Sequence, residues 1–317
     1  MKIVFMGTPD FAVASLEKIL EAGHEVAAVV TAPDRPAGRG QKLQFSAVKE
    51  AALKHSIPVL QPEKLKSEEF LSELRKINAD LFVVVAFRML TEVVWNMPPK
   101  GTINLHGSLL PQYRGAAPIN WAVIHGEKET GVTTFFIRHE IDTGNILQHR
   151  KIEITEKDNA GTVHDKLMHL GAELLAETIG KIERNEITPQ PQENFIGHQE
   201  LKHAPKIFRE TCHINWNASN EEIYNLIRGL SPYPAAYTDL VSEGKEPLSV
   251  KIFEVVKENN IKKREPGFIE TDGKTYLRVF TPDGSISILS LQMPGKKRMQ
   301  IDELLRGYKF PEGAKFN

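Results

Sequence analysis

Two short polar motifs contain residue types that can carry acyl-group chemistry without a metal. Asn104-Leu105-His106-Gly107 places an amide and an imidazole on one face of an expected strand, because alternate side chains of a strand point the same way. Asp142-Thr143-Gly144 offers a carboxylate in a later loop. If Asp142 lies near His106, its charge favours the imidazolium, and a protonated imidazole beside an amide suits a developing oxyanion. The alternatives are a histidine packed in the core and an aspartate of an ordinary turn.

The elements that must position these motifs follow a strand-helix-strand order. Residues 3–6 read as a buried strand, 11–22 as a helix and 26–30 as a second strand, which is the unit of a parallel sheet covered by helices. Further helices are expected at 46–55, 67–77, 119–125 and 160–184, and further strands at 58–60, 81–86, 102–106, 131–138 and 145–154. The sequence therefore predicts an α/β domain with a mainly parallel sheet.

The turn after the first strand argues against a dinucleotide cofactor. Gly7-Thr8-Pro9 invites that interpretation, but Pro9 replaces the second glycine of the Gly-x-Gly-x-x-Gly fingerprint and Ala12 replaces the third. We expect a Rossmann-like fold without its usual ligand, so a dehydrogenase is the least favoured function.

The C-terminal part of the chain has a different character. Residues 188–208 contain prolines, Gln and His with little periodicity, which predicts a linker between domains at 1–187 and 209–317. A helix is expected at 220–229, and strands at 234–240, 248–256, 266–271, 274–281 and 285–292. Turn residues separate these strands at short spacing, which indicates a small β-barrel.

Three basic clusters are candidates for contacts to an RNA backbone. A loop rich in Gly and Pro after the second strand carries Arg35, Arg39 and Lys42, which predicts a mobile segment that contacts phosphates. Lys262-Lys263-Arg264 and Lys296-Lys297-Arg298 fall in the expected barrel, and small barrels often bind oligonucleotides. The alternative for each cluster is ordinary solvated surface charge.

Composition limits the class of protein. The 317 residues carry a net charge of -1, so no whole-molecule field favours nucleic acid or a membrane. One cysteine, Cys212, excludes an internal disulfide and a Cys-rich metal site. The N-terminal apolar run is too short for a signal peptide, and no run approaches the ~18 apolar residues of a membrane helix. We expect a soluble, cytoplasmic protein without a membrane partner.

The motifs together resemble the folate-dependent formyltransferases. The resemblance rests on Asn104-Leu105-His106-Gly107-Ser108-Leu109-Leu110-Pro111, on Tyr113-Arg114-Gly115-Ala116-Ala117-Pro118-Ile119 and on Asp142-Thr143-Gly144. Narrower signals extend it over nearly the whole chain, namely the loop 34–43, Ala204-Pro205-Lys206-Ile207, Ile214-Asn215-Trp216, residues 227–235 and residues 292–297. The long basic loop and the C-terminal region point to the branch of the family that acts on tRNA.

The resemblance implies a Rossmann-like formyltransferase domain, a linker and an OB-like barrel. It implies transfer of a formyl group from 10-formyltetrahydrofolate to the α-amine of methionine on initiator methionyl-tRNA, and we expect a monomer that needs no metal. Asn104, His106 and Asp142 match the catalytic trio of the family, and Ser108, Leu109, Leu110 and Pro111 match its folate-contacting segment. Arg35, Arg39 and Lys42 match the loop that reaches the tRNA acceptor end, and Lys206, Lys262, Lys263, Lys296, Lys297 and Arg298 are expected to hold the tRNA backbone.

One segment departs from the family pattern. After the strand at 81–85 the family usually has a Tyr/Phe-Gly pair and an Ile-Leu-Pro turn, whereas this chain has Ala86-Phe87-Arg88-Met89-Leu90-Thr91. The end of this strand helps to wall the pterin pocket in the family. Phe87, Arg88, Met89 and Leu90 are therefore expected to contact the folate, through the backbone rather than through side chains.

Three other functions remain open at this point. A formyltransferase for a small amine, such as glycinamide ribonucleotide or an amino-sugar nucleotide, would need neither residues 205–317 nor tRNA. A formyltetrahydrofolate hydrolase would use water in place of the amine. A non-catalytic RNA-binding protein on a decayed enzyme fold would not need all three polar residues.

Overall fold

The computed structural model describes residues 1–37, 42–197, 200–259 and 264–317, without the side chains of residues 37 and 42. Contacts divide the chain into two units. Unit 1 comprises Met1–Pro118, Glu129–Glu153 and His164–His203, and unit 2 comprises Ile119–Lys128, Ile154–Val163 and Ala204–Asn317. Two segments from the first half of the chain thus belong to the C-terminal unit, which no local sequence pattern indicates. The predicted linker at 188–208 stays a prediction.

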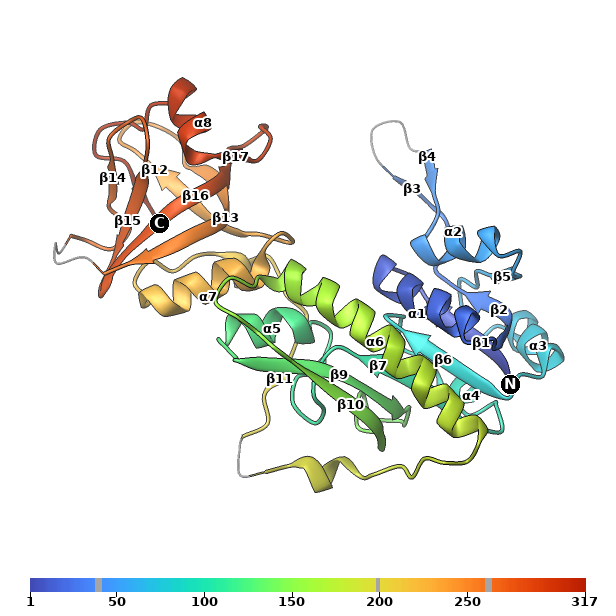
Figure 1. Ribbon diagram of the computed structural model, residues 1–317. Coiled ribbons are helices and arrows are strands. Elements are labelled where there is room, and N and C mark those ends of the chain that lie inside the picture. The colour runs from blue at the N-terminus through green and yellow to red at the C-terminus, as the bar shows by residue number, and fades with distance from the viewer. Residues whose placement is uncertain (38–41, 198–199, 260–263) are drawn as a thin grey trace. The chain divides into compact units, whose positions relative to one another are not determined.

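Among the described residues, seven strands form the mainly parallel sheet of unit 1 (Figure 1). Their order is β10 (Ile146–Glu153), β9 (Glu129–Phe136), β7 (Thr102–His106), β6 (Leu81–Val85), β1 (Lys2–Gly7), β2 (Glu25–Val30) and β5 (Val59–Leu60). The strands from β5 to β7 run parallel, whereas β9 pairs antiparallel with β7 and with β10. The predicted α/β fold is confirmed. Strands β1, β2 and β6 are almost continuously apolar because helices cover both faces of the sheet.

The helices of unit 1 divide between the two faces of the sheet (Figure 1). One face is covered by α1 (Asp10–Glu21), α2 (Ala47–Lys54) and α6 (Ala160–Glu183), and the other by α3 (Glu68–Ile77) and α4 (Glu92–Trp95). Val84 packs in a buried cluster with residues of α3 and α4. Asn104 pairs in register with Val84, so its side chain points to the face covered by α3 and α4.

The basic loop after β2 contains regular structure that was not predicted. Strands β3 (Arg35–Ala37) and β4 (Lys42–Gln44) form an antiparallel ladder in which Arg35 is opposite Gln44. Strands of three residues are too short to show a periodic pattern, so the sequence indicated a loop. Arg39 lies outside the described residues.

The sheet of unit 2 is antiparallel and closes almost fully into a barrel. Its strands follow the order β14 (Ile269–Thr271), β15 (Leu277–Thr281), β16 (Gly284–Gln292), β13 (Leu248–Glu258), β12 (Ala236–Val241) and β18 (Lys315–Phe316), with β17 (Met299–Gln300) beside β16. A bridge between Phe268 and Lys315 joins the two ends of this order, and the Phe316 N–H donates to the Gly267 carbonyl over 2.9 Å. The predicted OB-like barrel is confirmed. Closure leaves fewer unpaired strand edges exposed to other chains.

Short elements and helices complete the fold. Helix α7 (Asn220–Leu230) packs on β13 and begins with a capping box in which Ser219 and Glu222 bond each other's backbone N–H groups. Further elements that were not predicted are α4, β17, β18, α8 (Ile301–Gly307), β8 (Arg114–Gly115), β11 (His203–Ala204) and the 3-10 helices η1 (Gln192–Phe195) and η2 (Glu210–Cys212). Helix α5 (Pro118–Ile124) matches its prediction. Over the described ranges, no helix combines the length and apolar character needed to cross a bilayer.

Acid should weaken the contact between α6 and β10 through Glu177. Hydrogen bonds from Lys181 and Gln148, and the charge of Arg150, lower the pKa of Glu177 from 4.5 to about 2. A carboxyl group with a lowered folded-state pKa stabilises fully above its unfolded pKa, and this stabilisation is lost as the pH falls from about 4.5 through about 2. Its side chain is 36% exposed, so we expect Glu177→Gln to lower the free energy of unfolding at pH 7 by only about 0.5–1 kcal/mol.

Urea unfolding between pH 2 and pH 7 measures this effect. Glu177→Gln should flatten the pH dependence between about pH 4.5 and 2. Glu173→Gln is the matched control, because Glu173 lies on the same helix, is 59% exposed and contacts Arg150 at 3.4 Å. Equal pH profiles for the wild type and Glu177→Gln would contradict the expectation.

Closure of the barrel depends on the absence of a side chain at Gly267. Its φ is +83°, and a Cβ there would lie 2.1 Å from the Phe316 carbonyl oxygen. Gly273 has a similar φ of +70° and open space around it. We expect Gly273→Ala to cost about 1 kcal/mol from backbone strain alone, and Gly267→Ala to cost about 3 kcal/mol or more because the clash adds to the strain. Chemical denaturation of both variants tests this, and equal losses would show that the Gly267 contact does not matter.

Candidate functional site

His106 is held at the end of β7 by a backbone carbonyl. Its side chain is 7% exposed, and Nε2 lies 2.9 Å from the Tyr113 carbonyl oxygen. Because a carbonyl oxygen can only accept, Nε2 carries a hydrogen and donates it. Nδ1 lies 3.8 Å from Asp142 Oδ2, near enough for an interaction between charges and beyond direct hydrogen-bond distance. Nδ1 therefore makes no direct hydrogen bond with Asp142.

Asp142 occupies a constrained position in the loop between β9 and β10. Its φ is +54°, and its Oδ2 accepts the Gly115 N–H over 2.9 Å. The side chain of Gln192 donates to the carbonyl oxygens of Asp142 and Gly144, at 2.8 Å each. A Cβ at Gly144 would lie 1.6 Å from the Phe136 carbonyl oxygen, so this position requires glycine. In the Asp-Thr-Gly motif, Gly144 thus allows the close backbone approach and Asp142 directs its carboxylate toward the Gly115 N–H.

Asn104 and Asp142 line one cavity of about 90 Å³. The Asn104 amide is half-buried and has no hydrogen-bond partner within the described part of the chain. His106 points to the same side of β7, two residues further along. The structure therefore brings the three predicted residues together, with Asn104 and Asp142 in the cavity wall and His106 in contact with Asp142. His106 itself does not line this cavity.

The segment that departs from the family pattern forms much of the remaining wall. Phe87, Arg88, Met89 and Leu90 all line the cavity, as expected from their place after β6. Ala86 has a φ of +47°, so the chain turns sharply there without a glycine. Sequence reasoning missed the other lining residues, which are Val84, Phe135, Ile137, Arg138, His139, Glu140 and Ile141. These residues lie just before Asp142 in the sequence or on the strands that neighbour β7, and this position could have identified them as residues of the cavity wall.

The segment Ser108–Pro111 lies next to the catalytic candidates without lining this cavity. The Ser108 hydroxyl donates to the Gln112 carbonyl over 2.7 Å. Thr133 Oγ1 donates to the Ser108 carbonyl over 2.7 Å and accepts the Leu110 N–H over 3.1 Å. Leu110 packs in a buried cluster with Phe135. These bonds shape the turn after β7, and the predicted folate contacts of Ser108, Leu109, Leu110 and Pro111 stay predictions.

Two cations of unit 1 interact electrostatically, and one of them, Arg88, lines the cavity. Arg35 is exposed on β3, and Arg88 donates to the backbone carbonyls of Pro62 and Glu63. Partial burial, and then the positive charge of Arg35, lowers the pKa of Arg88. Among the predicted tRNA contacts, Arg39, Lys262 and Lys263 and the side chain of Lys42 lie outside the described residues.

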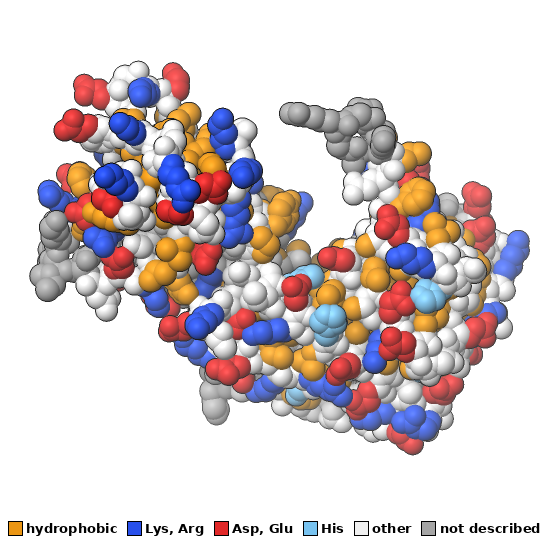
Figure 2. Space-filling model, turned by 45° about the horizontal axis from the view of Figure 1, so that its top comes forward, with side chains coloured by type: hydrophobic (Ala, Val, Ile, Leu, Met, Phe, Trp, Pro, Cys, Tyr) orange, Lys and Arg blue, Asp and Glu red, His pale blue; other side chains and the backbone are white. Residues whose placement is uncertain are grey.

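The predicted cations of unit 2 that the structure describes are exposed. Lys206 lies over the Phe208 ring, with Nζ 5.6 Å from its centroid. Lys296, Lys297 and Arg298 follow β16 in a turn. Arg298 differs from its neighbours because it donates to Ser290 Oγ over 2.8 Å and lies over the Phe253 ring at 4.7 Å. Figure 2 shows positive and negative side chains interspersed on the visible face of both units, so that face presents no broad surface of one sign to a polyanion.

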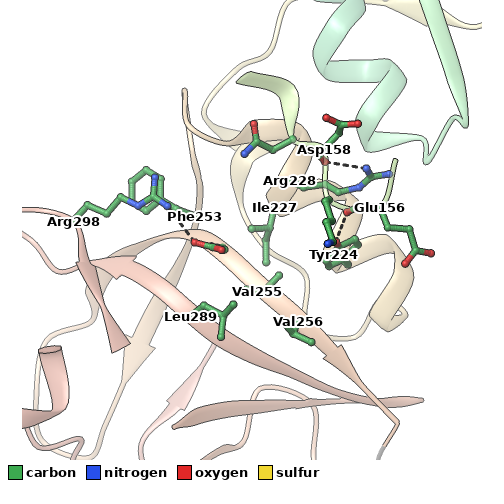
Figure 3. Close-up of a pocket in the computed structure, with 13 residues that line it drawn as sticks. Glu156, Asp158, Tyr224, Ile227, Arg228, Phe253, Val255, Val256, Leu289 and Arg298 are labelled. Atoms are coloured by element: carbon green, nitrogen blue, oxygen red, sulfur yellow. Dashed lines mark hydrogen bonds and ion pairs between the residues drawn. The ribbon is translucent and has the colours of Figure 1, made fainter. Parts of the chain in front are cut away.

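A second cavity, of about 400 Å³, lies within unit 2 (Figure 3). Its wall carries Arg228, whose guanidinium donates to the carbonyls of Thr155 and Asp158 over 3.1 and 3.0 Å. Arg298 lines it and pairs with Glu254 at 3.6 Å. Basic and acidic groups in the wall are thus engaged with neighbouring protein groups. None of the three catalytic candidates lies there, so its larger volume does not make it the reaction site.

Comparisons with known proteins identify the family of the chain. The Formyl transferase family matches residues 1–179, and the Formyl transferase, C-terminal domain family matches residues 206–309. The methionyl-tRNA formyltransferase of Bacteroides fragilis is 58% identical over 315 residues, which covers 99% of this chain and 97% of that protein. The methionyl-tRNA formyltransferase of Flavobacterium johnsoniae is 50% identical, in an alignment that covers 99% of this chain and 98% of that protein.

Solved structures agree with the fold. HypX from Aquifex aeolicus in complex with tetrahydrofolic acid matches with a TM-score of 0.66 and 19% identity, over 99% of this chain and 48% of HypX. This chain thus spans about half the length of HypX. The sugar 3N-formyl transferase WlaRD, in the presence of dTDP and 5-N-formyl-THF, matches with a TM-score of 0.66 and 22% identity, over 94% of this chain and 99% of WlaRD.

These likenesses confirm the resemblance stated from the motifs. Two family matches together span most of the chain, and relatives of 50–58% identity cover nearly all of it. The chain belongs to the formyl transferase family.

Proposed function

We propose that this chain transfers a formyl group from 10-formyltetrahydrofolate to the α-amino group of methionine on initiator methionyl-tRNA, in the cytoplasm. The chemistry rests on one observation: Asn104 and Asp142 line one cavity, and His106 lies 3.8 Å from Asp142. The choice of amine rests on relatives of 50–58% identity that carry the name methionyl-tRNA formyltransferase. The structure of HypX with tetrahydrofolic acid supports a folate as the donor.

The cavity wall suits the reacting end of the donor. Phe87, Leu90 and Phe135 provide apolar surface, and the Asn104 amide provides a polar group without a protein partner. A flat aromatic ring with polar edges fits a site that combines these features. We propose that the formyl group lies between this wall and His106.

The reaction proceeds by direct attack of the amine. The neutral amine of methionine adds to the formyl carbon, and the formyl oxygen becomes negative. The Asn104 amide and the Nδ1–H of protonated His106 donate hydrogen bonds to this oxygen. One such donor is worth about 3 kcal/mol in the transition state. The folate nitrogen then leaves with a proton, and the carbonyl of formylmethionine re-forms.

Asp142 completes the arrangement through its charge. Its Oδ2 lies 3.8 Å from His106 Nδ1, so the carboxylate faces the ring without forming a direct hydrogen bond to Nδ1. Asp142 also lines the cavity, so it can accept the amine proton through a water molecule.

The basic residues are proposed to hold the tRNA. Arg35 and Lys42, on the strands that flank Arg39, would place positive charge beside the acceptor end. Lys206, Lys262, Lys263, Lys296, Lys297 and Arg298 would contact the phosphate backbone. Such contacts weaken with salt because each one releases a counterion. The expected monomer of 35.6 kDa is checked by light scattering.

A formylation assay tests the choice of amine. The enzyme is supplied with 10-formyltetrahydrofolate and either charged initiator tRNA, charged elongator tRNA or glycinamide ribonucleotide. We expect formylation of the initiator tRNA at a far higher kcat/KM than of the other two. Formylation of the small amine alone would favour the small-amine transferase, and release of formate without any acceptor would favour the hydrolase.

Substitution of the three site residues tests the mechanism. We expect Asn104→Ala and His106→Ala each to lower kcat by about 100- to 1,000-fold, because each removes one donor to the oxyanion. Asp142→Asn should lower kcat while leaving KM for tRNA within about threefold. Arg35→Ala should instead raise KM for tRNA. It should also reduce the slope of the logarithm of the tRNA binding constant against the logarithm of the salt concentration by about one unit. Wild-type turnover in any of the first three variants would remove that residue from the mechanism.

A further inference from the structure

Gln192 lies in the segment that the sequence marks as a linker, yet its side chain is almost fully enclosed. It begins η1 and is 1% exposed. Its Nε2 donates to the carbonyls of Asp142 and Gly144, at 2.8 Å each. Its Oε1 accepts Nε and Nη2 of Arg114, at 3.0 and 2.6 Å. Both amide hydrogens and both oxygen lone pairs are therefore in use.

These four bonds join the two backbone segments that hold the catalytic candidates. Arg114 lies between Tyr113, whose carbonyl accepts from His106, and Gly115, whose N–H donates to Asp142. The other half of the Gln192 amide holds the loop that carries Asp142. One side chain thus connects the backbone next to the imidazole with the backbone of the carboxylate.

The surrounding chain reinforces this connection. The Tyr113 N–H donates to the Lys202 carbonyl over 2.7 Å, and the Lys202 N–H donates to the Gln112 side chain over 2.8 Å. Upstream of Gln192, Gln190 exchanges two backbone hydrogen bonds of 2.8 Å with Ile146 at the start of β10. Backbone bonds on both sides of Gln192 therefore fix its position relative to the site.

We propose that Gln192 is a positioning residue for formyl transfer, which acts by holding the Asp142 loop against the segment 113–115. The inference rests on the proposed function, since it assigns a role for the reaction to a residue that touches no substrate. A glutamine suits the position because it needs two donors toward carbonyls and an acceptor toward Arg114. A glutamate would direct an oxygen at two carbonyl oxygens, and an apolar side chain would leave buried polar groups unpaired.

Kinetics of Gln192→Met provide the first test. Methionine has a similar size and makes none of the four bonds. We expect kcat to fall by about 10- to 100-fold, as misplacement of a catalytic group by about 1 Å typically does, with KM for folate and tRNA within about threefold. Gln190→Met is the matched control, because the Gln190 side chain is exposed and contacts Asn194 at 3.3 Å. Equal kcat in Gln192→Met and Gln190→Met would overturn the proposal.

A double-mutant cycle separates positioning from general destabilisation. If Gln192 acts through Asp142, adding Gln192→Met to Asp142→Asn should lower kcat by no more than about threefold further. If the fold-loss in kcat of the double variant equals the product of the losses in the two single variants, Gln192 does not act through Asp142. Thermal melting and circular dichroism establish that each variant is folded. If Gln192→Met does not fold, Gln192→Glu keeps the acceptor for Arg114 and tests the donor half of the amide alone.

Amide hydrogen exchange gives a readout that does not depend on catalysis. The Gly115 N–H is bonded to Asp142 Oδ2, so its exchange reports directly on this contact. We expect at least tenfold faster exchange of this amide in Gln192→Met and unchanged exchange in Gln190→Met. If Asp142→Asn proves fully active, the proposed role of Asp142 fails, whereas the exchange result still decides whether Gln192 positions it. Unchanged exchange in Gln192→Met would overturn the inference.

Discussion

The site depends on three consecutive residues that hold two side chains from distant parts of the chain. The Tyr113 carbonyl accepts from His106, and the Gly115 N–H donates to Asp142. Because peptide groups are planar and stiff, these two bonds hold the ring and the carboxylate at a set separation. His106 and Asp142 have side chains 7% and 13% exposed, and burial of charged groups at this level is costly unless their partners are already in place. Preorganised groups of this kind are the ones that stabilise transient charge.

Secondary structure supplies the rest of the geometry. Strand β7 is parallel to β6 on one side and antiparallel to β9 on the other, with Ile103 opposite Phe136 and His106 opposite Thr133. The loop from β9 to β10 therefore begins beside the amino end of β7. It brings Asp142 to the cavity that Asn104 lines and to His106. The register with β6 also sets Asn104 on the face of Val84, which is the face covered by α3 and α4. A shift of one residue would turn both Asn104 and His106 into the opposite face.

The fold by itself does not select the amine. A sugar formyltransferase of 22% identity shares this architecture, as does half of HypX. Function therefore resides in the sites built on a shared fold, and the fold alone does not identify the substrate. In this chain the paired strands β3 and β4 present Arg35, and the nearly closed barrel presents exposed cations. These are the residues proposed above to contact the tRNA.

The sequence by itself was sufficient to predict the features of the fold and the site that depend on local patterns. Apolar periodicity indicated the parallel sheet and the barrel, and the motifs around His106 and Asp142 indicated formyl transfer. Short elements such as β3 and α8 escaped prediction because a few residues carry no period. Only the tertiary structure decided which nitrogen of His106 is engaged, that Ser108–Pro111 lies outside the cavity wall, and that Gln192 bonds the Asp142 loop. Such contacts join residues far apart in the chain, so no local pattern carries them, and a buried glutamine looks in sequence like any linker residue.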